Sequence, residues 1–104
     1  MKTFSFSCEL PNGVHARPAS HVEALCNQFS SDITWQNKRT GMSGNAKSVL
    51  SLIGTDTLLG DECLITINGQ DEDSAINQLK QFIVNEFPHC DAPLQSNEVQ
   101  TMLN

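Results

Sequence analysis

The sequence predicts one α+β domain, in which a four-stranded antiparallel sheet is covered on one face by three helices. Three observations support this class. Some segments alternate apolar and polar side chains, others repeat apolar side chains at helical spacing, and the two kinds follow the order β-α-β-β-α-β-α. A chain of 104 residues with 38% hydrophobic and 17% charged content is long and apolar enough for a single globular core.

The first strand is predicted over residues 2–8, because every second side chain from Phe4 onward is apolar. A turn signal follows at residues 11–13. Arg17 and Pro18 open the first helix, since proline suits a helix's first turn. The buried stripe of this helix is predicted to consist of Val22, Leu25, Cys26 and Phe29.

The middle of the chain carries weaker signals. Alternation at residues 33–35 predicts the second strand. The polar, glycine-containing stretch of residues 37–45 predicts a hairpin with a short third strand around Met42. Residues 46–53 are predicted as a short apolar helix that Gly54 ends.

The fourth strand is predicted at residues 63–67, and acids at residues 71–73 suit the start of the last helix. Pro88 is expected to stop this helix. Residues 88–104 show little periodicity, so the domain is predicted over residues 1–87, followed by a tail or a linker to a further domain. The apolar face of the last helix is predicted to be Ala75, Ile76, Leu79, Phe82, Ile83 and Phe87.

Charge and cysteine content exclude several functions. The net charge is −6, which argues against nucleic acid as a partner because no basic stripe could neutralise phosphates. No segment reaches the roughly 18 apolar residues of a membrane span, and the N-terminus lacks an apolar signal core, so we expect a cytoplasmic protein without membrane insertion. In that compartment the four cysteines are expected to be free, buried thiols.

The chemistry is concentrated where the first helix begins. His15 directly follows a glycine turn, and a helix start offers free backbone N–H groups and a partial positive charge. That charge disfavours an imidazolium, so a neutral, nucleophilic ring is expected. Once phosphorylated, the ring would place its phosphoryl oxygens near the amides of Ala16 and Arg17, and the Arg17 guanidinium would add a fixed charge.

The segment Gly13-Val14-His15-Ala16-Arg17-Pro18-Ala19 resembles the active-site motif of the HPr family, the phosphocarriers of the bacterial phosphoenolpyruvate:sugar phosphotransferase system. The resemblance covers roughly residues 2–87 and implies that family's open-faced β-sandwich. It implies that His15 carries a phosphoryl group on Nδ1 and that Arg17 assists the transfer. The donor would be phospho-Enzyme I and the acceptor a sugar-specific IIA domain, with no cofactor required.

A second segment of the same resemblance covers residues 46–50. In some relatives the serine aligned with Ser48 is phosphorylated by a kinase, although a helix-capping role is the stronger local interpretation of Ser48. Leu52 and Ile53 are expected to turn inward. The residues expected to dock a partner are Ser20, Lys47, Val49 and Leu50.

The chain departs from the family on the expected docking face. Ala24, Asn27 and Ser51 stand where many members carry lysines, so electrostatic steering toward an acidic Enzyme I should be weaker. Weak steering matters less when donor and acceptor share one chain. With the tail after Pro88, this favours an HPr domain of a multiphosphoryl transfer protein.

The sequence is also compatible with two other functions. One is a regulatory HPr-like protein of the nitrogen-related branch, acting by protein docking. The other is a metal-binding domain using His15, His21 and cysteines, although these residues and the group His89-Cys90-Asp91 lack ligand spacing, so no metal is expected. The sequence shows no second catalytic group beside His15 except Arg17, which fits a stoichiometric phosphoryl carrier better than an enzyme acting alone.

Overall fold

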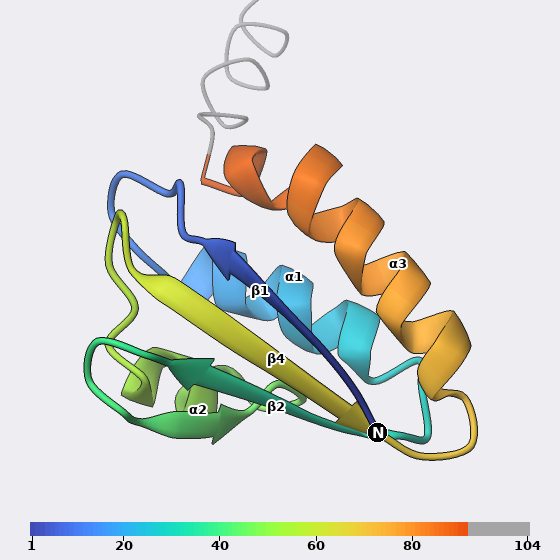
Figure 1. Cartoon of the computed structure of the whole chain (residues 1–104). Coiled ribbons are helices and arrows are strands. Elements are labelled where there is room, and N and C mark those ends of the chain that lie inside the picture. The colour runs from blue at the N-terminus through green and yellow to red at the C-terminus, as the bar shows by residue number, and fades with distance from the viewer. Residues whose placement is uncertain (92–104) are drawn as a thin grey trace, which may run out of the picture.

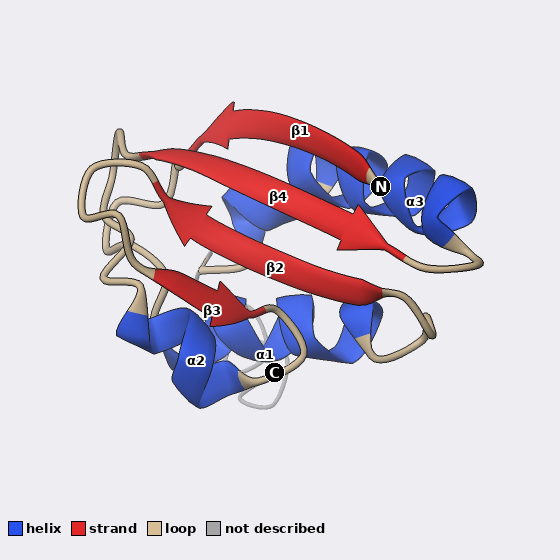
Figure 2. Cartoon of the chain, turned by 60° about the horizontal axis from the view of Figure 1, so that its bottom comes forward, coloured by secondary structure: helices blue, strands red, loops and turns tan. Residues whose placement is uncertain are grey.

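The computed structural model describes residues 1–91, and the predicted tail lies largely outside them, at residues 92–104. The elements are β1 (Lys2–Ser7), α1 (Ala16–Cys26), β2 (Asp32–Asn37), β3 (Ser43–Asn45), α2 (Val49–Gly54), β4 (Glu62–Asn68), α3 (Glu72–Asn85) and the 3-10 helix η1 (Phe87–His89). The strands form one antiparallel sheet in the order β1-β4-β2-β3. All three α-helices lie against the same face of this sheet (Figures 1 and 2), which confirms the predicted fold class.

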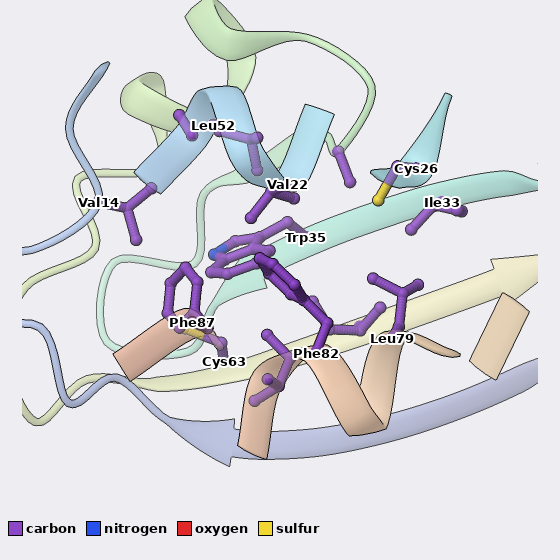
Figure 3. Close-up of a cluster of buried hydrophobic side chains, with 14 of the residues drawn as sticks. Val14, Val22, Cys26, Ile33, Trp35, Leu52, Cys63, Leu79, Phe82 and Phe87 are labelled. Atoms are coloured by element: carbon purple, nitrogen blue, oxygen red, sulfur yellow. The ribbon is translucent and has the colours of Figure 1, made fainter. Parts of the chain in front are cut away.

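The core lies between the sheet and the helices. Trp35 on β2 is paired with Ile65 on β4, and both side chains are buried on the helical face. Because side chains alternate along a strand, the opposite face keeps polar residues such as Thr34 and Thr66. Val22 of α1 and Leu79 of α3 close the core from the helical side (Figure 3).

An aromatic cluster fixes the end of the described chain. The ring of Phe87 lies 5.9 Å from Phe6, 5.7 Å from Trp35 and 6.0 Å from Phe82, measured between ring centroids. Its side chain is fully buried (Figure 3). The segment that follows α3 is therefore held against the sheet by apolar packing.

The last helix ends earlier than predicted. We expected Phe87 on the apolar face of this helix, but α3 ends at Asn85 and Phe87 begins η1. Pro88 explains the break, because a proline has no N–H for the bond to the carbonyl four residues earlier and its ring clashes with that carbonyl. The described residues 88–91 continue against the domain, with Cys90 buried.

The middle segment also differs in detail from the predictions. The third strand begins at Ser43, one residue after Met42. The second helix was predicted from residue 46 but starts at Val49, because Ser48 N–H donates to the Asn45 carbonyl at 3.0 Å and closes a turn first. Gly54 is the last residue of this helix.

The prediction for Ile53 was wrong. Its side chain is 40% exposed, whereas Leu52 is completely buried. A helix of six residues presents one narrow face to the core, and Leu52 fills it.

Four thiols lie in the core, as the composition predicted. Cys8, Cys26, Cys63 and Cys90 are all free and buried. Burial raises the pKa of Cys26 and of Cys63 to about 12 and that of Cys90 to about 11. At neutral pH these groups are therefore uncharged thiols. Over residues 1–91, no helix is both long and apolar enough to cross a membrane.

Candidate functional site

The loop between β1 and α1 presents His15. Gly13 has a φ of +72°, which favours glycine, and a Cβ atom at this position would lie 2.4 Å from the Thr57 carbonyl oxygen. The next residue binds the same carbonyl, because Val14 N–H donates to Thr57 O at 2.9 Å. Leu10 is buried, and its carbonyl accepts from Gly13 N–H at 3.0 Å. A glycine and two hydrogen bonds therefore fix the backbone immediately before His15.

His15 occupies the N-cap position of α1 without capping it. Its backbone is extended, with φ −111° and ψ −162°, and its side chain accepts no bond from the helix. The helix begins at Ala16, one residue earlier than predicted. Pro18 has no N–H and Ala19 N–H donates to His15 O at 3.0 Å, which leaves the amides of Ala16 and Arg17 without intrahelical partners. These two donors, expected from the sequence, lie beside the ring and can bind an anion.

The imidazole ring of His15 is half exposed, with 45% of the side chain accessible. Its Nε2 atom is buried and lies 3.0 Å from Oδ1 of Asp91. The contact falls outside hydrogen-bond geometry, so it is a close approach of Nε2 to the carboxylate rather than an aligned hydrogen bond. Nδ1 makes no hydrogen bond with any residue of the described chain.

Asp91 is itself held in place. The Asn12 side-chain amide donates to Oδ2 of Asp91 at 3.1 Å, and the Asp91 side chain is only 16% exposed. The contact with His15 is the main cause that lowers the pKa of the Asp91 carboxyl, and Asn12 adds to it. The positive charge of Arg17 lowers the same pKa by a smaller amount. Neither Asp91 nor Asn12 was predicted as a neighbour of His15.

The Arg17 guanidinium makes no ion pair with any carboxylate in residues 1–91. It is partly exposed, and its charge is close enough to Asp91 to lower the pKa of that carboxyl. Ser20, predicted as a docking residue, is exposed on the following turn, and its hydroxyl donates to Ala16 O at 2.8 Å. Among residues 1–91, the surroundings of His15 therefore combine a half-exposed ring with two amides and one guanidinium that have no partner.

The start of α2 is built differently. Ser48 is its N-cap and accepts a bond from Ser51 N–H at 3.3 Å, as the local interpretation predicted. The Glu23 carboxylate of α1 accepts from Val49 N–H at 3.0 Å. Glu23 lies eight residues after His15, roughly 12 Å along the helix axis, so Ser48 is not part of the His15 cluster.

The other predicted docking residues differ in exposure. Leu50 is 81% exposed, whereas Val49 is partly buried against the core. The Lys47 ammonium donates to the Phe29 carbonyl at 2.7 Å, which holds this charge against the segment that follows α1. His21 is exposed and the described residues contain no group of three metal-ligating side chains.

The fold is an open-faced sheet with helices on one side, and a histidine lies beside the amides that begin the first helix. This is the architecture of a carrier that can hold an anionic group on a histidine. Comparison with known proteins agrees. Residues 2–85 match the family model described as "PTS HPr component phosphorylation site". The chain belongs to the HPr family, the phosphocarriers of the phosphoenolpyruvate:sugar phosphotransferase system.

Individual relatives show two size classes. The chain is 62% identical over 100 residues to multiphosphoryl transfer protein 2 of Escherichia coli K12, covering 93% of this chain but 12% of that protein. It is 34% identical over 80 residues to phosphocarrier protein HPr of Mycoplasma pneumoniae, covering 77% of this chain and 90% of that protein. A Mycoplasma histidine-containing phosphocarrier of known structure has a TM-score of 0.76 and 32% identity, covering 83% of this chain and 96% of the other.

Proposed function

We propose that His15 accepts a phosphoryl group on Nδ1 from phospho-Enzyme I and passes it to a IIA domain of a sugar permease. HPr-family proteins interact with these two classes of partner. The amides of Ala16 and Arg17 would hold the phosphoryl oxygens, and the Arg17 guanidinium would neutralise their charge. The regulatory and metal-binding alternatives have no comparable support.

One observation carries this proposal. His15 is the residue at which a half-exposed imidazole meets free helix amides, inside the segment that matches the family model. Because Nε2 faces Asp91, Nδ1 is the ring nitrogen left for attack on phosphorus. Transfer of this kind depends mainly on positioning and charge stabilisation.

The test is the intact mass of the protein after incubation with Enzyme I and phosphoenolpyruvate. We expect one acid-labile phosphoryl group on the wild type and none on His15→Ala, while His21→Ala, which removes an exposed histidine of the same helix, gains the group normally. Enzyme I alone and a fused Enzyme I should both be tried as donors. Absence of phosphorylation with every donor would refute the relay.

We propose that the partners dock over Ser20 and the exposed face of α2 around Leu50, with Lys47 and Val49 at its edge. The 81% exposure of Leu50 supports this choice, since a large apolar side chain on the surface gains most from being covered. Leu50→Ser should therefore raise the Enzyme I concentration needed for half-maximal phosphorylation. An unchanged concentration dependence would remove Leu50 from the docking surface.

We further propose that the natural context is a cytoplasmic multiphosphoryl transfer protein, in which the carrier and its donor share a chain. The 62% identity to such a protein supports this, as does the neutral character of Ala24, Asn27 and Ser51. Phosphorylation of Ser48 remains a proposal with less support, because Ser48 already caps α2 and the Glu23 carboxylate lies at the same helix start.

A further inference from the structure

The contact between His15 and Asp91 links the site to a segment that the family match does not include. The match ends at residue 85, and Asp91 follows the 3-10 helix after α3. Two contacts position the Asp91 carboxylate. The buried ring of Phe87 anchors the segment, and Asn12, from the loop that presents His15, binds the second carboxylate oxygen.

We propose that Asp91 is a positioning residue for the phosphoryl relay, holding the His15 ring with its proton on Nε2 and its lone pair on Nδ1. This inference rests on the proposed function, because it concerns the ring that accepts the phosphoryl group. The distance of 3.0 Å between Nε2 and Oδ1 carries it.

The tautomer follows from simple electrostatics. A carboxylate 3.0 Å from Nε2 repels a lone pair on that atom and attracts a proton. The neutral ring therefore keeps its proton on Nε2, and the lone pair is on Nδ1. A carboxylate that orients a histidine in this way has the same effect on the tautomer as the orienting partners of catalytic and metal-binding histidines.

The charge that develops during transfer strengthens the argument. As the Nδ1 lone pair forms a bond to phosphorus, the bond between phosphorus and the donor atom breaks and its electron pair returns to the donor. The proton stays on Nε2, so the His15 ring becomes a phosphorylated imidazolium. Its positive charge lies against the Asp91 carboxylate, on the ring side away from the phosphoryl group. Asp91 therefore stabilises the ring more after attack than before it.

The experiment measures the ring and the reaction separately. The 15N chemical shifts of the His15 ring give the tautomer ratio, and time-resolved intact mass with Enzyme I and phosphoenolpyruvate gives the rate of phosphorylation. The variants are Asp91→Ala, Asn12→Ala, which frees the second carboxylate oxygen, and the control Asp73→Ala. Asp73 is an exposed carboxylate that pairs with Lys2 at 3.3 Å, at the opposite end of α3 from the segment that carries Asp91.

We expect Asp91→Ala to raise the share of ring protonated at Nδ1 and to slow phosphorylation roughly tenfold. Asn12→Ala should change both quantities in the same direction by less, and Asp73→Ala should change neither. A tautomer ratio or a rate that Asp91→Ala leaves unchanged overturns the proposal, as does a faster rate. If the wild type itself gains no phosphoryl group, the proposed function fails, and the tautomer ratio alone then decides whether Asp91 positions the ring.

Discussion

The first two helices begin in opposite ways. At α1 the N-cap is His15, whose side chain leaves the helix uncapped, so the amides of Ala16 and Arg17 have no partner within the part of the chain that the structure describes. At α2 the Ser48 hydroxyl and the Glu23 carboxylate both accept bonds from the first amides. A helix start whose amides are bound by its own protein has fewer donors left for an anion. The difference indicates that α1 gives up local stability to keep a site open, whereas α2 is a structural element.

The largest expected effect on the free energy of unfolding comes from the loop between β1 and α1. Gly13→Ala should lower the free energy of unfolding by about 3 kcal/mol, because a Cβ there overlaps the Thr57 carbonyl at a positive φ. Gly60→Ala is a matched control, since Gly60 has a φ of +88° and open space around its Cβ position; the strain alone should cost about 1 kcal/mol. Urea denaturation measures both, and equal losses would show that the close approach to Thr57 is unimportant.

Removing an acceptor from the first amides of α2 should have the next largest effect on stability. Glu23→Ala removes the acceptor of the Val49 amide and should lower the free energy of unfolding by about 1.5 kcal/mol, a typical contribution of a hydrogen bond to a charged group. The control is Glu9→Ala, which removes an exposed carboxylate. If denaturant midpoints of the two variants coincide, Glu23 does not stabilise α2.

A side chain that caps the start of α1 should stabilise the protein and abolish its phosphorylation. His15→Asn supplies a good N-cap and should raise the free energy of unfolding by about 1 kcal/mol, while abolishing phosphorylation by Enzyme I. His21→Asn introduces the same residue inside α1, where no cap is needed, and should give no gain. A His15→Asn protein no more stable than the wild type would argue that α1 gives up no stability at its start.

The smallest effect should come from the start of α3, and it should disappear in acid. Hydrogen bonds from the Ser31 hydroxyl, then from the Ser30 amide, lower the pKa of Asp71 from 3.8 to about 2. A carboxyl with a depressed pKa stabilises the fold above its ordinary value, and this stabilisation is lost as the pH falls from 3.8 toward 2. Urea midpoints of the wild type and Asp71→Asn should therefore differ at pH 5 and converge near pH 2. A constant difference across this range would show that the ionised carboxylate is not what stabilises the turn.

Local sequence signals predicted most of the fold and the centre of the site. The alternation of Phe4 and Phe6 and the stripe of α1 depend on neighbours along the chain, so one sequence suffices to find them. The motif around His15 is equally local. Ile53 was misjudged because its apolar character says nothing about how narrow the inward face of a six-residue helix is.

The missed residues are those whose role depends on tertiary contacts. Asn12 and Asp91 lie 79 positions apart in the sequence, and no periodicity or motif links them. Glu23 and Val49 lie 26 positions apart; the sequence assigned no role to Glu23 and predicted Val49 only as a docking residue. Only the folded structure shows that Asp91 lies beside the start of α1 and Glu23 at the start of α2.

The four buried thiols provide a built-in set of probes for local opening. A thiol in the core reacts with an alkylating reagent only when the structure around it opens, so its labelling rate gives the free energy of that opening. Cys26 lies in the core between α1 and the sheet, whereas Cys90 lies one residue before Asp91. Comparing the two rates would separate detachment of the C-terminal segment from unfolding of the whole domain without introducing any foreign label.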